Sequence, residues 1–119
     1  MAQNRSFGDK GEQLAKAYLE KAGYEILDLN WTFGKAEIDI IAYINKQIIF
    51  VEVKTRSSDS FGNPEDFVMM PKQSQMAYAA DEYIFLMEHQ GEVRFDVISI
   101  LFNKQGEHVL NHIEDAFWP

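Results

Sequence analysis

Hydrophobic positions follow two different periods along the chain, and the changes between them mark the expected elements. From about Asp9 to Ala22, apolar side chains recur every three or four residues. This spacing predicts a helix capped near Ser6 and ended by Gly23. A second helix is predicted from Pro71 to about Glu88. Its apolar stripe consists of Met76, Ala77, Ala80, Tyr83, Ile84 and Met87.

Short apolar runs bounded by turn residues predict the strands. They cover about Tyr24 to Trp31, two arms within Glu37 to Arg56, then Val93 to Phe102 and His108 to Ile113. The segment Ser57 to Pro64 is small and polar, which indicates a loop. The order α-β-β-β-α-β-β predicts an α/β fold with a central mixed β-sheet flanked by helices, in a single domain over residues 1–119.

The two arms within Glu37 to Arg56, EIDIIAYINKQIIFVEVKTR, predict a hairpin. Asn45-Lys46 is the expected two-residue turn, because Asn tolerates a positive φ. With this turn, one face of the hairpin is apolar and is expected to lie in the core. The apolar face consists of Ile38, Ile40 and Ala42 against Ile49, Val51 and Val53.

Charged residues interrupt the other face of the hairpin. The same turn places Asp39 opposite Glu52 and Glu37 opposite Lys54. Two carboxylates opposed in this way repel by about 3 kcal/mol at an effective dielectric near 20. A shared proton, the Lys54 ammonium or a divalent cation could offset the repulsion. Because Lys54 is expected to pair with Glu37, a cation is favoured, with Mg²⁺ or Mn²⁺ suited to oxygen ligands.

A simpler interpretation competes with the metal site. Alternating charges are common where the end of a hairpin emerges into solvent. Two polar residues on the inward stripes of the helices, Glu12 and Gln73, favour the site because both can face the end of the sheet. Each is also consistent with a helix end that emerges from the core.

Composition and charge narrow the function classes. Hydrophobic residues make up 46% of the chain and cysteine is absent, so no disulfide or thiolate metal site is available. The net charge of −8 argues against a large nonspecific nucleic-acid surface. Residues 73–119 hold two basic and eight acidic side chains, so the hairpin region is much closer to neutral. No signal peptide or membrane-spanning stretch is evident, and a cytoplasmic protein without a membrane partner is expected.

Asp39, followed by Glu52-Val53-Lys54, is similar to the D-x(n)-E-x-K pattern of the PD-(D/E)xK nuclease superfamily. Further segments extend the similarity from about Phe7 to Phe117. They are GDKGEQLAKAYLEKAGYEIL, EIDIIA, FVEVKTRSSDSFGNP, PKQ, RFDVISI and HIEDAF. Together they closely resemble the YraN family, small bacterial proteins described as endonuclease-like and similar to Holliday-junction resolvases.

The resemblance implies a restriction-endonuclease-like fold and a role for each residue of the hairpin patch. Asp39 and Glu52 would bind Mg²⁺ or Mn²⁺ with the backbone carbonyl of Val53. Lys54 would orient the attacking water and stabilise charge on the phosphate. Glu12 would be an additional metal or water ligand.

The resemblance also implies contacts to nucleic acid, and it has departures. Thr55, Arg56 and Lys72 would contact phosphates, and Gln73 matches a polar residue on the following helix. The family often has glycine where this chain has Ala36, and an arginine where it has Thr32. The second departure removes a possible backbone contact.

Two functions are consistent with these features. The first is a metal-dependent nuclease hydrolysing DNA, including branched or recombination intermediates; symmetric cutting of a four-way junction would require a homodimer. The alternative is a non-catalytic domain that keeps the fold and binds nucleic acid or a protein. His108 and His112 are not expected to hold a metal, and Phe61 is a candidate substrate contact.

Overall fold

Seven elements make up the part of the chain that the computed structural model describes, residues 7–57 and 70–119. They are α1 (Phe7–Lys21), β1 (Glu25–Phe33), β2 (Ala36–Ile44), β3 (Gln47–Ser57), α2 (Met70–Leu86), β4 (Val93–Phe102) and β5 (His108–Ile113). The order is the predicted one, and the last two strands have the predicted bounds. The Ser6 cap, Phe61 and residues 58–64 of the predicted loop lie outside the described residues.

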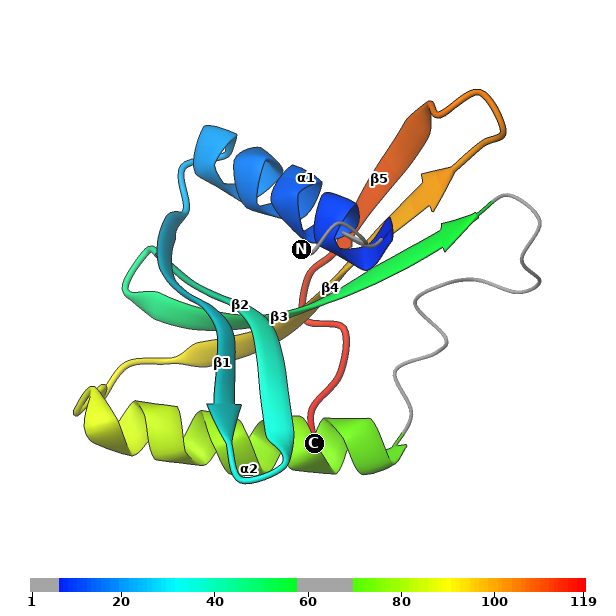
Figure 1. Cartoon of the computed structure of the whole chain (residues 1–119). Helices are drawn as coiled ribbons and strands as arrows, with labels where there is room; N and C mark the ends of the chain where they lie inside the picture. The colour runs from blue at the N-terminus through cyan, green and yellow to red at the C-terminus, as the bar shows by residue number, and fades with distance from the viewer. Residues whose placement is uncertain (1–6, 58–69) are drawn as a thin grey trace, which may run out of the picture.

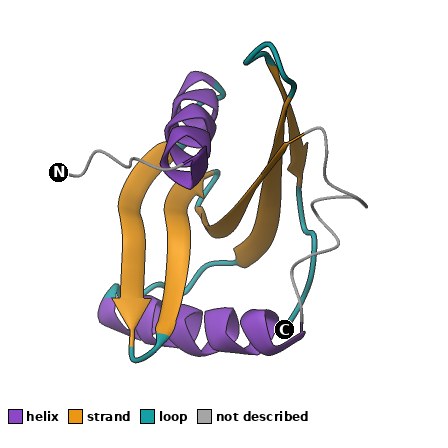
Figure 2. Cartoon of the chain, turned by 45° about the vertical axis from the view of Figure 1, so that its right-hand side comes forward, coloured by secondary structure: helices purple, strands orange, loops and turns teal. Residues whose placement is uncertain are grey.

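The strands form one mixed sheet between the two helices. Their order is β1-β2-β3-β4-β5, and only the β3–β4 pair is parallel. A parallel pair needs a crossover, and α2 lies in this one. Helix α1 covers one face of the sheet and α2 the other (Figure 1). The sheet is strongly twisted, so that β1 and β2 turn away from the other strands (Figure 2).

Each face of the sheet has its own hydrophobic core. The α1 core consists of Ala15, Leu19, Tyr24, Ile40, Ala42, Ile49, Val51, Ile98, Ile100 and Phe102. The α2 core consists of Ala36, Ile38, Ile41, Ile48, Phe50, Met76, Ala79, Ala80, Tyr83 and Phe95. Strands β2, β3 and β4 are buried on both faces, which explains their nearly continuous apolar sequences.

The two predicted chain reversals are confirmed. Gly23 has a φ of 98°, and the Tyr24 amide donates to the Leu19 carbonyl at 2.9 Å, as in a Schellman end of a helix. Asn45 and Lys46 have φ values of 52° and 66°, as a type I′ turn requires.

The predicted faces of the hairpin are wrong at one position. Ile38 packs with Ile41 and Phe50 against α2, whereas Ile40 and Ala42 lie in the α1 core. Side chains of a regular strand alternate between faces, so Ile38 and Ile41 can share a face only where the strand is irregular.

Strand β1 is irregular at the same level. Asn30 has a φ of 52°, in the left-handed region. It lies between the pairs Leu29–Ile40 and Trp31–Ile38, directly across from the irregular part of β2. Both strands therefore change faces together at this level.

A buried polar network ties α1 to β4 and β5. Asp96 is fully buried and receives two hydrogen bonds of 2.8 Å from Arg94. His112 Nε2 lies 2.7 Å from Asp96 Oδ2, and its Nδ1 lies 2.9 Å from the Tyr18 hydroxyl. Arg94 also donates to the Tyr24 hydroxyl at 2.8 Å. His112 thus has a structural role in this network.

Neither of the two described helices is long and apolar enough to cross a bilayer.

Candidate functional site

The candidate site lies where β2 and β3 separate. Their antiparallel ladder runs from Ile44–Gln47 to Ile40–Val51, and Asp39 and Glu52 come next on each strand. Beyond this point β3 continues to Ser57 in pairing with β4. The Val53 amide donates to the Asp39 carboxylate at 2.8 Å, where a regular ladder would supply a carbonyl. The Asp39 side chain thus ends the ladder, and the two predicted carboxylates lie at its opening.

Glu52 is buried between two ammonium groups. Lys54 Nζ lies 3.5 Å from Glu52 Oε2, and Lys72 Nζ lies 3.5 Å from Glu52 Oε1. Oε1 has no hydrogen-bond partner among the residues that the structure describes. The predicted pairing of Lys54 with Glu37 is wrong, because separation of the strands leaves Glu37 exposed and turns Lys54 to Glu52.

The opening of the ladder is an unfavourable place for a second negative charge. Burial, and then repulsion from Glu52, raise the pKa of Asp39 to about 8, although the hydrogen bond from Val53 opposes the rise. At neutral pH the Asp39 carboxyl therefore keeps its proton unless further positive charge approaches. A divalent cation would supply that charge and favour the ionised pair.

Helix α1 brings Glu12 to the same opening. The helix can approach β3 closely because it has Gly11 there, and a Cβ at Gly11 would overlap the Thr55 hydroxyl. Burial raises the pKa of Glu12, a side-chain hydrogen bond from Asn30 lowers it, and Glu37, Asp9 and Glu52 raise it. The influence of Glu52 and Glu37 indicates that Glu12 lies within electrostatic reach of the opening, and we refer to Glu12, Asp39 and Glu52 as the acidic cluster.

The donors present fit a Mg²⁺ or Mn²⁺ ion only if backbone and water complete the ligand set. Within residues 7–57 and 70–119, no three His, Asp or Glu side chains form a ready metal-binding group. Asp39 and Glu52 offer carboxylate oxygens. The N–H and C=O of one residue in a strand point to the same neighbour, so the Val53 carbonyl also faces β2 and Asp39. Mg²⁺ commonly keeps several waters beside one or two carboxylates.

The predicted phosphate contacts lie around the opening, in different environments. Lys72 reaches from α2 to Glu52 and to the Glu37 carbonyl, 3.5 Å away. Arg56 is half-buried and donates to the Thr55 carbonyl at 2.9 Å, while Thr55 lies beneath α1. Gln73 is half-buried on α2. The structure thus brings Lys54 and Lys72 together at Glu52, with Arg56 two residues beyond Lys54 on β3.

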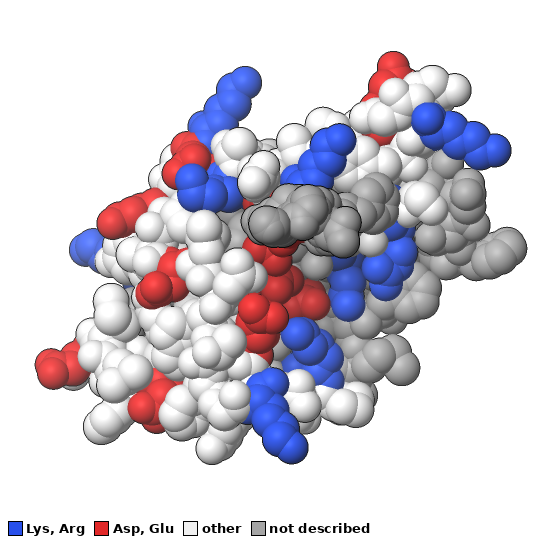
Figure 3. Space-filling model, in the orientation of Figure 1, with Lys and Arg blue, Asp and Glu red and all other residues white. Residues whose placement is uncertain are grey.

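The charge distribution of the molecule agrees with this geometry. Acidic side chains gather at the middle of one face, between the two helices, and basic side chains lie directly beside them (Figure 3).

Asn30 was missed by sequence reasoning. Its signal was an isolated Asn inside a predicted strand, a residue type that tolerates positive φ and is depleted from strands.

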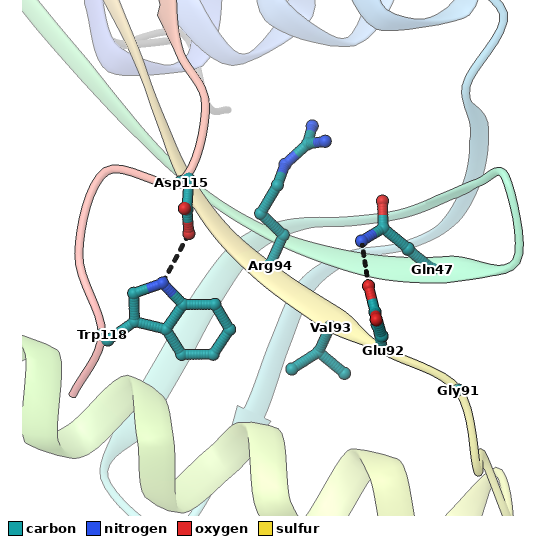
Figure 4. A pocket seen from close by; sticks show the side chains of 7 residues that line it. All are labelled: Gln47, Gly91, Glu92, Val93, Arg94, Asp115 and Trp118. Carbon is teal, nitrogen blue, oxygen red and sulfur yellow. Dashed lines mark hydrogen bonds between the residues drawn. The ribbon is translucent and has the colours of Figure 1, made fainter.

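A pocket of about 580 Å³ lies apart from this site (Figure 4). It is lined by Gln47, Gly91, Glu92, Val93, Arg94, Asp115 and Trp118. Gln47 begins β3, whereas Glu52 is roughly 17 Å further along at the rise of a strand. Gln47 donates to Glu92, and Asp115 accepts from the Trp118 indole, so both carboxylates that line the pocket already have partners. The acidic cluster therefore remains the candidate site.

Comparison with known proteins identifies the family. The model of "Uncharacterised protein family UPF0102" matches residues 11–100. A UPF0102 protein of Flavobacterium psychrophilum is 45% identical over 118 residues, which cover 99% of this chain and 98% of the relative. A UPF0102 protein of Christiangramia forsetii is 48% identical over 99% of this chain and 98% of the relative. A UPF0102 protein of Bacteroides thetaiotaomicron is 41% identical over 100% of this chain and 98% of the relative. The chain therefore belongs to the UPF0102 (YraN) family.

Proposed function

We propose that this protein is a metal-dependent nuclease with a restriction-endonuclease-like fold of the PD-(D/E)xK superfamily, which hydrolyses phosphodiester bonds of DNA. One observation carries the proposal. Asp39 and Glu52 lie where the β2–β3 ladder opens, and Glu52 Oε1 is buried there without a hydrogen bond from the described residues, with the Lys72 ammonium 3.5 Å away as its ionic partner. A buried carboxylate oxygen without a hydrogen bond is costly unless a ligand satisfies it.

The side chains have separable roles in this chemistry. Bound Mg²⁺ or Mn²⁺ would supply positive charge and make a water more nucleophilic. Asp39, Glu52 and the Val53 carbonyl would hold the ion, with Glu12 as a further ligand or water partner. Lys54 lies beside Glu52 and would offer its ammonium group to the attacking water and to the negative charge that develops on the phosphate.

Nucleic acid would reach the site along the basic side of the opening. Lys72 and Arg56 would bind phosphates, with Thr55 and Gln73 as polar contacts. The net charge of −8 disfavours a broad DNA footprint, so the proposal is for a few phosphates close to the site. A cytoplasmic location, where bacterial DNA is found, belongs to the same proposal.

The test is cleavage of labelled four-way junction, flap, single-stranded and duplex DNA in Mg²⁺ or Mn²⁺. Glu52→Gln and Lys54→Met keep approximate side-chain shape and remove the charges. Each is expected to reduce the cutting rate about a hundredfold or more. Glu20→Gln and Lys104→Met are matched controls, because both residues are exposed and lie outside the cluster.

The outcomes separate the two candidate functions. Metal-dependent cutting that both charge-removing variants lose, and both controls keep, would support the nuclease. No cutting of any substrate, together with no heat on titration of Mn²⁺, would contradict it and favour the non-catalytic binding domain. If a four-way junction is the preferred substrate, we expect a homodimer, which light scattering measures directly.

A further inference from the structure

Aromatic rings form a row where the β1–β2 turn lies against α2 (Figure 1). The row begins in the α2 core, where the Trp31 ring meets the buried Tyr83 ring edge-on. The Trp31 and Phe33 rings are stacked with their centroids 6.3 Å apart, and the Phe33 and Tyr78 centroids are 5.1 Å apart. Tyr78 is 60% exposed, so the row ends in a ring that presents much of its surface to solvent. We refer to Phe33 and Tyr78 as the aromatic platform.

A tight turn holds the aromatic platform in place. Gly34 has a φ of 63°, and a Cβ built on it would lie 3.8 Å from Tyr78 Cε2, so the turn is in van der Waals contact with the ring. Phe33 pairs with Ala36 across this turn. Ala36 is three residues before Asp39 on β2, which is about 10 Å at the rise of a strand. The platform therefore lies close to the opening of the β2–β3 ladder.

Cations adjoin the platform on the side of the opening. Lys72 precedes Tyr78 by six residues on α2, about 9 Å along the helix axis. Its Nζ lies 3.5 Å from Glu52 Oε1 and 3.5 Å from the Glu37 carbonyl. Lys35 is exposed in the turn itself and adds positive charge there. An exposed ring beside ammonium groups fits a nucleotide, because the base stacks on the ring while the phosphate is attracted to the cations.

The other strongly exposed aromatic ring of α2 lies in a different setting. Phe85 is 76% exposed and follows Tyr78 by seven residues, about two turns of the helix. The sequence has no Lys or Arg from residue 73 to residue 93, whereas it has four carboxylates there, Asp81, Glu82, Glu88 and Glu92. A phosphate would be repelled at Phe85. Tyr78, in contrast, lies at the border between the cations and the acidic half of α2.

We propose that the aromatic platform binds one unstacked base of single-stranded DNA, with the adjoining phosphate at Lys72 and the strand leading toward the opening. A base inside a duplex is already stacked and paired, so it cannot lie on a protein ring without leaving the helix. The site would therefore take single strands, flaps and branch points in preference to intact duplex. The inference rests on the proposed function for its ligand, DNA, although the binding step itself needs no metal ion.

The test is fluorescence anisotropy of a labelled single-stranded oligonucleotide in metal-free buffer at one fixed salt concentration. Two further probes are a duplex of the same length and an abasic strand, which has the same phosphates without bases. Tyr78→Leu and Phe33→Leu remove the rings of the platform. Phe85→Leu is the matched control, because it removes an exposed ring of the same helix outside the platform. Circular dichroism melts verify that each variant is folded.

We expect the wild type to bind the single strand more tightly than the duplex and the abasic strand. Tyr78→Leu should weaken binding of the single strand about tenfold, the usual scale for loss of one stacked base, and leave binding of the abasic strand unchanged. Phe33→Leu should act in the same direction, and Phe85→Leu should change neither affinity. A merely structural role of the rings would weaken binding of both strands equally.

Unchanged binding of the single strand by Tyr78→Leu would overturn the inference, and so would an equal loss for the abasic strand or a preference of the wild type for duplex. If the wild type nevertheless cuts DNA in Mg²⁺ or Mn²⁺, the inference fails alone and the proposed nuclease stands. If the platform binds single strands as expected but no substrate is cut, the nuclease fails and the non-catalytic binding domain is favoured instead.

Discussion

Asp39 is under two opposing influences at the opening of the ladder. The Val53 amide donates to its carboxylate, which favours the ionised form. Burial and the Glu52 charge favour the protonated form and prevail, so the pKa rises to about 8. One residue therefore both ends the hairpin ladder and determines the charge of the candidate site.

Stability should depend on pH through this residue. The pKa of the Asp39 carboxyl rises from an ordinary value of 3.8, which the unfolded chain retains, to about 8 in the folded protein. Below pH 4 both the folded and the unfolded chain hold the proton, and the Asp39 side chain makes its full contribution to the free energy of unfolding. This contribution is lost as the pH rises toward 8. In metal-free buffer, Asp39→Asn should therefore become progressively more stable relative to the wild type between pH 5 and pH 8, as urea unfolding would measure.

Two variants provide the comparison for this experiment. Glu20→Gln changes an exposed carboxylate on α1 and should show no such trend. Asp39→Ala removes the acceptor of the Val53 amide and should lose about 1 to 3 kcal/mol relative to Asp39→Asn. A constant difference between Asp39→Asn and the wild type across the pH range would contradict the raised pKa.

Much of the candidate site could be predicted at the level of single residues. Asp39 and Glu52 follow from the turn at Asn45-Lys46 and the counting of positions along two strands. The partner of Lys54 could not be predicted, because counting assumes that the strands stay paired beyond Ile40–Val51. The left-handed backbone of Asn30 could not be predicted either, because no periodicity reports a single backbone angle.

At the scale of elements, the contact of α1 with β3 determines where Glu12 lies. Gly11 faces the Thr55 side chain so closely that a methyl group would overlap its hydroxyl. Gly11→Ala should therefore destabilise the protein by about 1 to 3 kcal/mol, although alanine favours a helix. Urea unfolding checks this, with Gly8→Ala as the control because Gly8 is exposed on the same helix. Equal stability of the two variants would show that α1 can move away from β3 without loss.

The elements themselves follow well from the sequence where one period holds throughout. Strands β4 and β5 have the predicted bounds because Gly, Asn and polar residues delimit them. The prediction fails at Ile38, where the strand is irregular and alternation no longer holds. Helix α2 ends at Leu86, before the predicted Glu88, and Met87 is exposed, although the apolar spacing included it.

At the scale of the whole molecule, the Asp96 network joins α1, β4, β5 and the C-terminal segment. The Asp115 amide also donates to Asp96 at 3.0 Å. Hydrogen bonds from His112 and Arg94 outweigh burial and lower the pKa of Asp96, so a fully buried carboxylate stays ionised. None of this was predicted: His112 and Asp115 are 16 and 19 residues from Asp96, and the nearby Arg94 gave no sign that the carboxylate would be buried.

Removal of the Arg94 guanidinium should leave the buried Asp96 carboxylate without its main partner. Arg94→Met is expected to destabilise the protein by about 3 to 5 kcal/mol, measured by urea unfolding. The double variant Arg94→Met/Asp96→Asn should recover part of the loss, because no uncompensated charge remains. A loss below about 1 kcal/mol in Arg94→Met would contradict the importance of this ion pair.

The small number of cations at the opening predicts how DNA affinity should depend on salt concentration. Three cations on β3 and α2 are the proposed phosphate contacts: Lys54 and Lys72 at Glu52, and Arg56 two residues beyond Lys54. Neutralising three phosphates predicts a slope of about −3 for the logarithm of DNA affinity against the logarithm of salt concentration. Fluorescence anisotropy in metal-free buffer measures this slope, and Lys72→Met should reduce it by about one unit, whereas Lys104→Met should not. A salt-independent affinity would contradict phosphate binding.

The parallel pairing of β3 with β4 has a consequence for how the protein folds. Ile48 pairs with Val93 and Ser57 with Phe102, so every partner is 45 residues further along the chain. Asp39 and Glu52 are brought together by a two-residue turn instead, over a much shorter loop. Short loops close faster and lose less chain entropy than long ones. We therefore expect the two carboxylates to meet early in folding, before β4 docks on the other edge of β3 and completes the sheet.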